Sequence, residues 1–450
     1  MYLLYSLLLT IGLIAASPLF VIDAVRKGKY ITGLSQRLGN IPRINSNNLP
    51  IIWLHCVSVG ETAAARTLVD GVIARFPSHR LVISTTTITG QKVARQMFGN
   101  QAAAIFYFPI DWAWTVRRVL RIVQPAAVII TETELWPRLF YECRSRGIPV
   151  LLVNGRISTR SFRRYKLVRS FIRGVLSDLV LALMQSTQDA ERLRELGMAE
   201  ERIRMFGNLK FDSAGTIVDV HVSDLLRNRF GFDGSEPLIV AASTHDSEER
   251  VVIEAFKLVR NQRQARLLIA PRHPERFAVV ISLLRQSGLS WSQRSHESLP
   301  GDVNSEVILL DSVGELRAVY ALADVAFVGG SIAPHGGHNV LEPAALGICV
   351  ITGPHMDNFE AVTSVLLDED AIIQLPDIPT SEAPATLASV LMELLSDNQK
   401  RRGIGQRAQA VCRRNAGATE RTVEAIAGVL SQSSTRDVLS VTSLPATVLK

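Results

Sequence analysis

Residues 328–347 read VGGSIAPHGGHNVLEPAALG, and this stretch predicts the fold of the second half of the chain. The apolar run at 324–328 has the composition of a buried parallel strand, and apolar residues follow at helical spacing over 339–346. The intervening loop contains four glycines, Gly329, Gly330, Gly336 and Gly337. Such a turn can bind phosphate, because the free N–H groups and the dipole of the following helix point at it. The glycines could equally serve packing in a plain strand–loop–helix crossover.

Composition predicts an ordered globular chain of two domains. The chain has 450 residues, of which 47% are hydrophobic and 20% are charged. The net charge of +7 favours an anionic partner, which could be nucleic acid, a phospholipid surface or a phosphorylated substrate. The four cysteines are scattered without a C-x-x-C pair. This spacing indicates neither a disulfide framework nor a zinc ribbon, and it suits a reducing cytoplasm.

The N-terminus predicts a membrane anchor. Residues 2–22 carry no charge, and the basic residues Arg26, Lys27, Lys29 and Arg37 follow. This asymmetry favours an uncleaved anchor at 1–24 and a basic linker at 25–48, with the rest of the chain in the cytoplasm. A cleaved signal peptide is less favoured, because no basic residue precedes the apolar run. A segment that lies on the membrane surface remains an alternative.

Strand-like and helical runs alternate along the rest of the chain, which is the βαβ pattern of parallel sheets. In the first half the predicted strands lie at 51–57, 80–86, 126–131, 148–153 and 179–184. After a change of unit near 206–219, strands follow at 238–242, 266–270, 307–310, 324–328 and 348–352. We therefore expect an α/β fold with domains at 49–210 and 211–430, a cleft between them, and a disordered serine-rich tail at 431–450.

Polar motifs follow several predicted strands. SVGE at 58–61 places Glu61 where a general base could reach a sugar hydroxyl, although a carboxylate there also stabilises a helix start. TETELWP at 131–137 adds Glu132, whose burial would be costly without a partner. NLKFD at 208–212 offers the cation Lys210. Each motif alone is equally compatible with capping or a solvated loop.

Other motifs in the second half suit a phosphate ligand. APRHP at 270–274 offers Arg272, and VGE at 313–315 is a glycine turn at a helix start. Glu342 could accept hydrogen bonds from ribose hydroxyls. No histidine or cysteine spacing supports a metal site, and neither a P-loop nor a G-x-S-x-G motif occurs.

A basic amphipathic helix is predicted over 156–176. Its arginines alternate at helical spacing with aromatic and aliphatic residues, as in helices that lie on anionic membranes. An ordinary exposed helix with one packed face is the alternative. The few aromatic residues beside the arginines argue against binding of single-stranded nucleic acid.

Taken together, these residues resemble the 3-deoxy-D-manno-oct-2-ulosonic acid (Kdo) transferases of lipopolysaccharide synthesis. The matching motifs are HCVSVGET at 55–62, TETELWP at 131–137, NGRIS at 154–158, GNLKFD at 207–212, STHDSEE at 243–249, APRHPERF at 270–277, FVGGS at 327–331, GGHNVLEP at 336–343 and GPHMDNF at 353–359. They follow the family order over nearly the whole chain after the anchor. Val340 stands where the family often has proline, and His335 where a basic residue is common.

The resemblance implies a GT-B glycosyltransferase with two Rossmann-like domains facing a cleft, at the cytoplasmic face of the inner membrane. It implies inverting transfer of Kdo from CMP-Kdo to a lipid A precursor, lipid IV-A, with release of CMP and without a metal or other cofactor. Glu61 would be the general base, and Glu132 and Lys210 would stabilise the transition state. The residues that the resemblance assigns to CMP are Pro271, Arg272, Val313, Gly314, Glu315, Asn339, Val340, Leu341 and Glu342.

Two other functions fit the same fold. One is a GT-B transferase that uses a different nucleotide sugar. The other is an inactive, membrane-anchored binding protein, against which the presence of base, cation and phosphate-site residues argues. Nucleic acid is not an expected partner.

Overall fold

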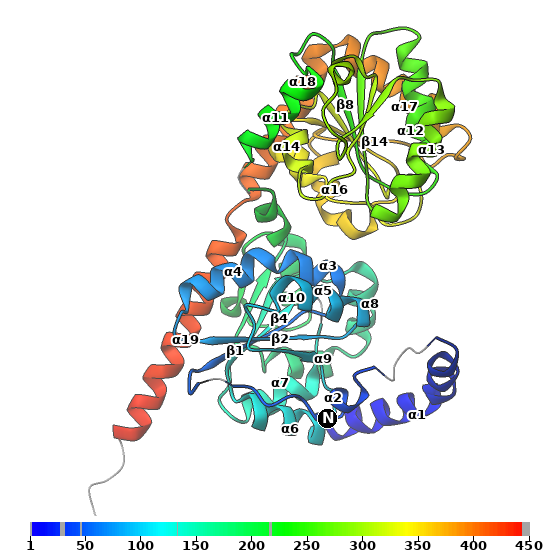
Figure 1. Ribbon diagram of the computed structural model, residues 1–450. Helices are drawn as coiled ribbons and strands as arrows, with labels where there is room; N and C mark the ends of the chain where they lie inside the picture. The colour runs from blue at the N-terminus through cyan, green and yellow to red at the C-terminus, as the bar shows by residue number, and fades with distance from the viewer. Residues whose placement is uncertain (1, 28–31, 46, 133, 216–217, 443–450) are drawn as a thin grey trace, which may run out of the picture. The chain divides into compact units, whose positions relative to one another are not determined.

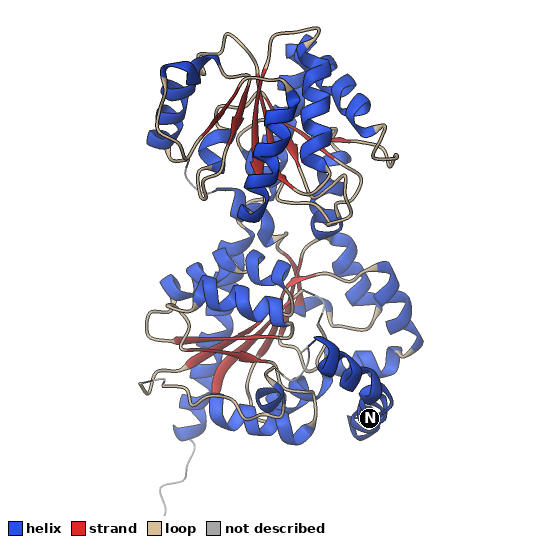
Figure 2. Ribbon diagram, turned by 45° about the vertical axis from the view of Figure 1, so that its right-hand side comes forward, coloured by secondary structure: helices blue, strands red, loops and turns tan. Residues whose placement is uncertain are grey.

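The computed structural model describes residues 2–27, 32–45, 47–132, 134–215 and 218–442. The chain forms two units, and each contains one parallel sheet with helices on both faces (Figures 1 and 2). Unit 1 consists of Met1–Asp212 and Gly417–Lys450, and unit 2 consists of Ser213–Ala416. The predicted α/β class with two Rossmann-like units is confirmed.

The described part of unit 1 has a seven-stranded sheet in the order β3-β2-β1-β4-β5-β6-β7. Its strands are β1 (Ile51–His55), β2 (Arg80–Thr85), β3 (Ala104–Tyr107), β4 (Pro125–Thr131), β5 (Val150–Gly155), β6 (Leu181–Met184) and β7 (Ile203–Met205). Its helices are α1 (Tyr2–Lys27), α2 (Leu34–Arg37), α3 (Val59–Ala64), α4 (Arg66–Arg75), α5 (Ile88–Phe98), α6 (Ala113–Val123), α7 (Pro137–Arg144), α8 (Thr159–Leu167), α9 (Arg169–Leu176), α10 (Thr187–Glu195) and α19 (Ala418–Thr442).

Both faces of this sheet are buried, and β1 shows why. Ile51 and Trp53 belong to one apolar core, whereas Ile52 and Leu54 belong to a second core on the opposite face. Successive strand residues point to opposite faces, so a strand covered on both sides is apolar at every position. This continuous apolar run is the pattern that identified the strand in the sequence.

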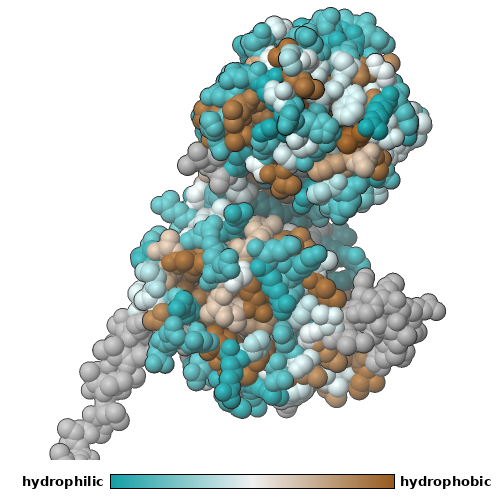
Figure 3. Space-filling view, viewed as in Figure 1, coloured by the Kyte–Doolittle hydropathy of each residue, from teal (hydrophilic) through white to brown (hydrophobic). Residues whose placement is uncertain are grey.

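The described part of unit 2 also has a seven-stranded sheet, in the order β10-β11-β9-β8-β12-β13-β14. Its strands are β8 (Leu238–Thr244), β9 (Arg266–Pro271), β10 (Trp291–Gln293), β11 (Val307–Leu309), β12 (Val325–Val328), β13 (Cys349–Thr352) and β14 (Ile373–Gln374). Its helices are α11 (Val220–Phe230), α12 (Glu248–Arg260), α13 (Phe277–Ser287), α14 (Leu316–Tyr320), α15 (Leu341–Ala345), α16 (Glu360–Leu367), α17 (Ala383–Ser396) and α18 (Asn398–Asn415). Most of the visible surface of each unit is polar, with small apolar patches (Figure 3).

Every strand expected from the sequence is present, but four short strands were missed: β3, β7, β10 and β14. All four are edge strands: the first sheet ends in β3 and β7, and the second sheet ends in β10 and β14. Runs of so few residues are too short to show a period, so only their pairing with a neighbour defines them.

The second domain does not extend to residue 430 as expected. Helix α19 belongs to unit 1, where Val423 and Ile426 pack in the same core as Leu68 and Val72 of α4. Asp212 accepts hydrogen bonds from the backbone N–H groups at the start of this segment, at 2.6 Å and 2.5 Å. The order of the sequence assigned these residues to the preceding domain, because their packing against α4 is visible only in the tertiary structure.

The expectation of a disordered tail is also wrong for its first part. Helix α19 continues through residues 431–442, and residues 443–450 lie outside the described residues. The serine-rich composition that suggested disorder is compatible with continuation of a helix whose first turns are packed.

The expected membrane-spanning anchor at 1–24 is not supported. In the part of the chain that the structure describes, no helix combines the length and apolarity needed to cross a bilayer. The Tyr2 hydroxyl donates to Asp178, and the Tyr5 hydroxyl donates to Asp111 at 3.0 Å. These hydrogen bonds fix the beginning of α1 against unit 1, a contact that the hydropathy of the segment could not reveal. The side chains of residues 16–31, which include the start of the expected basic linker, lie outside the described residues.

Candidate active site

The turn from β1 into α3 positions the side chain of Glu61. Ser58 caps α3, and its hydroxyl accepts from the Glu61 N–H at 3.4 Å. In return, Glu61 Oε1 accepts from Ser58 Oγ at 3.0 Å, and Oε2 accepts from the Val57 N–H at 2.8 Å. This is a reciprocal capping arrangement, readable from the spacing of serine and glutamate. It folds the carboxylate back toward the end of β1.

A third donor reaches Glu61 from β4. Thr131 Oγ1 lies 3.0 Å from Glu61 Oε2 and 3.0 Å from the His55 carbonyl oxygen, so its hydroxyl can donate to either. Glu61 is only 9% exposed. A buried carboxylate with three possible donors has one fixed orientation at the carboxyl end of the sheet.

The environment of Glu61 gives it the properties of a base at neutral pH. Burial, with a smaller contribution from the charge of Glu132, raises the pKa of Glu61 to about 7. The hydrogen bonds from Val57, Thr131 and Ser58 oppose this rise because they favour the ionised form. A general base is most effective when its pKa is near the working pH.

Glu132 follows β4 in a strained backbone conformation. Its φ of 59° lies in the left-handed region, which costs a residue other than glycine about 1 kcal/mol or more. Its N–H donates to the Val153 carbonyl at 2.9 Å, which continues the sheet ladder. Burial and the charge of Glu132 raise the pKa of nearby Glu134. Thr133, between them, lies outside the described residues.

Lys210 joins these carboxylates from a 3₁₀ segment (Leu209–Gly215) that follows β7. Asn154 accepts from the Leu209 N–H at 3.1 Å, and Asn208 accepts from the Lys210 N–H at 3.0 Å. Burial lowers the pKa of the Lys210 ammonium, while Glu132 and Glu61 oppose this effect. The structure therefore brings the three predicted catalytic residues together at one edge of the unit 1 sheet.

The rings of His55, Phe108 and Trp136 pack against one another near these residues. The His55 and Phe108 rings have centroids 4.0 Å apart, and those of Phe108 and Trp136 are 4.5 Å apart. Burial lowers the pKa of His55 to about 3, so the imidazole is neutral. His55 Nε2 and Trp136 Nε1 are buried without a hydrogen-bond partner. Sequence reasoning gave His55 no role, although it lies within the HCVSVGET motif.

Of the two roles that the sequence left open for the glycine loop of unit 2, a phosphate site or packing, the structure favours packing. Glu248, which is fully buried, accepts from the N–H groups of Gly330 at 2.7 Å, Ser331 at 2.9 Å and Ile332 at 2.9 Å. It also accepts from the His245 N–H at 2.9 Å. A carboxylate of the chain itself thus occupies the donors that would have faced a phosphate. Sequence reasoning missed this role, and the signal was the pair of acids in STHDSEE at the start of an apolar helix.

At the start of α15, too, hydrogen bonds are made by side chains of the chain itself. Asn339 Oδ1 accepts from the Leu341 N–H at 3.1 Å, and Asn339 Nδ2 donates to Glu342 at 3.0 Å. The side chains of Val340 and Leu341 are fully buried. Val340 and Leu341 can therefore face a ligand only through their backbone.

The remaining predicted CMP residues lie on loops that follow β9 and β11. Arg272 is exposed, and its N–H donates to the Thr244 carbonyl at 2.9 Å, next to Pro271 at the end of β9. Val313 is 86% exposed, and Gly314 has a φ of +96°. Glu315 pairs with Arg294 at 2.7 Å. All of the predicted CMP residues are in unit 2.

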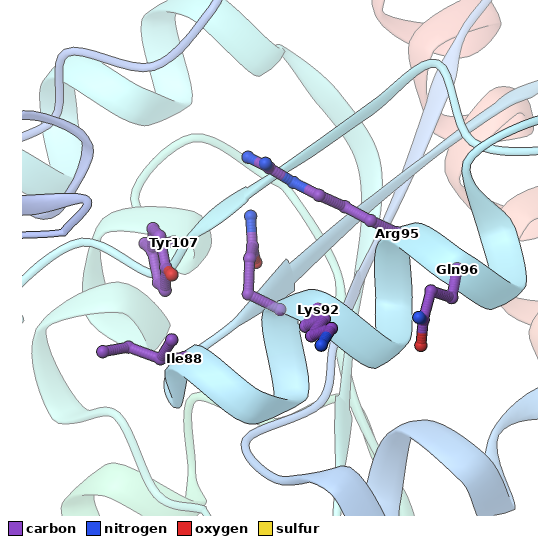
Figure 4. Close-up of a pocket in the computed structure, with 6 residues that line it drawn as sticks. Ile88, Lys92, Arg95, Gln96 and Tyr107 are labelled. Atoms are coloured by element: carbon purple, nitrogen blue, oxygen red, sulfur yellow. The ribbon is translucent and has the colours of Figure 1, made fainter. Parts of the chain in front are cut away.

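Unit 1 also contains a cavity. It lies beside α5, and the residues that line it are Ile88, Gln91, Lys92, Arg95, Gln96 and Tyr107 (Figure 4). In the close-up the Arg95 side chain extends above the other labelled residues, and Tyr107 and Gln96 lie at opposite sides of the group (Figure 4). No residue predicted for catalysis or for CMP contributes to this lining.

Comparison with known proteins shows the family to which the chain belongs. Residues 32–213 match the family described as 3-deoxy-D-manno-octulosonic-acid transferase (kdotransferase). A protein of that name from Haemophilus influenzae is 33% identical over 411 residues, which cover 91% of this chain and 94% of that protein. This chain belongs to the 3-deoxy-D-manno-octulosonic acid transferase family. The transferase from Bordetella pertussis is also 33% identical, over 83% of this chain and 86% of its own.

Solved structures agree on the fold of this glycosyltransferase. A glycosyltransferase from Rickettsia africae matches with a TM-score of 0.52 at 13% identity, over 85% of this chain and 99% of that one. At this identity the similarity concerns the fold alone, with its two parallel-sheet α/β domains of the GT-B class.

Proposed function

We propose that this transferase moves Kdo from CMP-Kdo to a hydroxyl of a lipid A precursor, lipid IV-A, and releases CMP in lipopolysaccharide synthesis. The observation that carries the proposal is the position of Glu61, a buried carboxylate with three donors and a pKa near 7. Family membership supports the sugar and the pathway.

In the proposed mechanism Glu61 accepts the proton of the acceptor hydroxyl. The hydroxyl oxygen then bonds to the anomeric carbon of Kdo on the face opposite the phosphate, and the electron pair of the broken C–O bond stays on the phosphate of CMP. A single displacement of this kind inverts the anomeric centre. The reaction as proposed uses no metal or other cofactor.

Glu132 and Lys210 would act on the charges that develop during this displacement. The anomeric carbon becomes cationic in the transition state, which a nearby carboxylate stabilises. The Lys210 ammonium would attract the carboxylate of Kdo or the leaving phosphate, because a cation removed from water interacts strongly with an anion. The donor held by unit 2 must reach Glu61 of unit 1 during turnover.

Donor binding is assigned to the loops of unit 2. Arg272 provides an exposed cation, and Gly314 and the residues beside it provide backbone groups. Because Glu248 occupies the N–H groups of the glycine loop, we assign the phosphate to side chains at the same edge of the sheet.

We further propose that the enzyme binds the cytoplasmic face of the inner membrane without crossing it. The apolar side chains of α1 that are more than half exposed are Leu4, Leu7, Leu8, Ile11 and Ile14. The predicted basic helix is in fact two helices, α8 and α9, separated at Val168. No described side chain of α8 is buried, so its arginines are available to anionic headgroups. Association of purified protein with anionic vesicles, weakened by high salt, would support this location.

The test is mass spectrometry of the reaction of purified enzyme with CMP-Kdo and a tetraacylated lipid A precursor. We expect a mass increase of one or more Kdo units with the wild type and with Glu191→Gln, an exposed carboxylate on α10. Glu61→Gln should form little or no product. Absence of product from the wild type, with both substrates intact, would contradict the proposed donor or acceptor. Full activity in Glu61→Gln would contradict only the catalytic assignment, and a screen of other nucleotide sugars would identify a different donor.

A further inference from the structure

Four imidazoles converge in unit 2. His245 follows β8, His273 follows β9, and His335 and His338 lie in the loop after β12. Strands β9, β8 and β12 are neighbours in the sheet, so their carboxyl ends bring these side chains together. His245 Nε2 and His338 Nε2 are 2.7 Å apart. The His245 ring centroid lies 4.3 Å from that of His335 and 5.2 Å from that of His273.

The pair at the centre of this cluster is held in place by the fold. Glu248 fixes the backbone of His245 and of Gly330 through hydrogen bonds of 2.9 Å and 2.7 Å. Gly330 has a φ of +68°, and a Cβ there would lie 2.8 Å from the His338 ring. Only glycine therefore allows the His338 ring to meet the His245 ring end to end, with an angle of 4° between the ring planes.

The distance between the two Nε2 atoms describes a hydrogen bond and not a shared metal. One imidazole donates its N–H to the lone pair of the other. Two nitrogens bound to one tetrahedral zinc would be about 3.3 Å apart, given the usual Zn–N distance. Within the described residues, no group of three or more histidine, cysteine, aspartate or glutamate side chains has a metal-binding arrangement.

The surroundings of the pair are rich in basic side chains. His245 and His338 are partly buried, while Arg272, His273 and His335 are exposed at the edge of the cluster. Burial, followed by electrostatic contributions from neighbouring histidine and arginine side chains, lowers the pKa of His245 to about 4 and that of His338 to about 3.

The charged groups nearby on adjoining elements do not neutralise this edge. Arg276 also faces His245, but it pairs with Asp246 at 2.7 Å and with Glu249 at 3.1 Å. Glu248 is engaged by backbone N–H groups. An anion bound at the edge would favour the charged form of the pair, which would gain its proton at the Nδ1 atom that is unprotonated in the neutral state and would retain the shared N–H···N bond.

We propose that His245, His273, His335 and His338 form the site for the phosphate of the donor nucleotide, and that the His245–His338 pair gains one proton when the phosphate binds. This inference rests on the proposed function. When the bond between the sugar and the phosphate oxygen breaks, the electron pair stays on that oxygen and the phosphate charge changes from −1 to −2. The cationic pair stabilises this added charge, while the proton of the acceptor hydroxyl goes to Glu61.

The experiment is calorimetric titration of the full-length enzyme with CMP and with cytidine at pH 7, in two buffers that differ in heat of ionisation. The wild type should take up close to one proton with CMP and none with cytidine. His245→Gln and His338→Gln should bind CMP about tenfold more weakly or worse, as expected for loss of a charge-assisted hydrogen bond, and should bind cytidine as the wild type does. His221→Gln, an exposed histidine on α11, is the matched control.

His273→Gln keeps the test valid if the central variants fail to fold, because this exposed side chain can be replaced without disturbing the packing. It should weaken CMP binding and leave cytidine binding unchanged. Equal CMP affinity in all variants, or no proton uptake by the wild type, would overturn the histidine site and leave the proposed function standing. Failure of the folded wild type to bind CMP at all would overturn the donor assignment and this inference with it.

Discussion

Replacing Glu61 by glutamine removes one buried titratable group and retains its shape. In the folded chain the pKa of Glu61 is about 7, whereas the ordinary value is 4.5. At a pH between these two pKa values, Glu61 takes up a proton when the chain folds. The wild type therefore loses stability as the pH rises through this range. The glutamine variant has no such group at this position and does not lose this contribution.

The size of the effect follows from the shift. A change of one pKa unit corresponds to 1.36 kcal/mol, so a shift from 4.5 to about 7 makes the ionised group unfavourable by about 3 kcal/mol above pH 7. Glutamine at position 61 can still accept a hydrogen bond from the Val57 N–H, but its amide group cannot accept from both Ser58 and Thr131. The lost hydrogen bond lowers the stability of the variant by the same amount at every pH. The difference in unfolding free energy between variant and wild type should therefore grow by about 3 kcal/mol between pH 4 and pH 8.

Urea unfolding followed by tryptophan fluorescence measures this difference. Of the five tryptophans, all except Trp291 lie in unit 1, so the signal reports mainly on the unit that contains Glu61. Glu191→Gln should follow the wild type at both pH values. A difference between Glu61→Gln and wild type that is the same at pH 4 and pH 8 would refute the raised pKa. The same pKa predicts that wild-type turnover rises with pH through about 7, since the base must be ionised.

Three further perturbations test other parts of the structure. Lys210→Met should lower kcat by about 100- to 1,000-fold, because it removes one preorganised charge, while circular dichroism remains that of the wild type. Glu248→Ala leaves four backbone N–H groups without this acceptor, two of them in buried hydrogen bonds, and should cost about 3–5 kcal/mol in thermal unfolding, whereas Glu254→Ala on the exposed face of α12 should cost little. A chain that ends at Ala416 removes α19 and exposes the core under α4, so unit 1 should lose about 5 kcal/mol or more, whereas a chain that ends at Gln432 should remain stable. Unchanged activity of Lys210→Met would contradict the first prediction, and equal stability of Glu248→Ala and Glu254→Ala would contradict the second. A stable chain that ends at Ala416 would contradict the third.

Part of the candidate site was predictable because it depends on contacts close in sequence. The spacing of Ser58 and Glu61 encodes the reciprocal cap, and that cap fixes the carboxylate in the structure. The order of strands and helices placed Glu132 after a strand of the first sheet, whereas Lys210 follows β7, a strand that the sequence did not show. Their meeting at the carboxyl edge of this sheet follows from parallel pairing.

Other features depended on residues far apart in the chain. Glu248 and Gly330 are separated by 82 positions, and their hydrogen bond occupies an N–H group that could otherwise have bound a phosphate. The His245–His338 contact spans 93 positions. Neither motif alone indicates its partner, because a chain can bring many such pairs together and only the packed fold selects one.

The sequence alone determined the two α/β units, the position of Glu61 at a capped helix start, and the family. These depend on hydrophobic periodicity, local capping and motif order, all of which are local properties of the chain. Only the tertiary structure decided that α19 belongs to unit 1, that Tyr2 and Tyr5 fix α1 to that unit, and that four histidines meet in unit 2. The physical reason is that burial and hydrogen bonding between distant segments exist only after the chain has folded, so no local pattern records them.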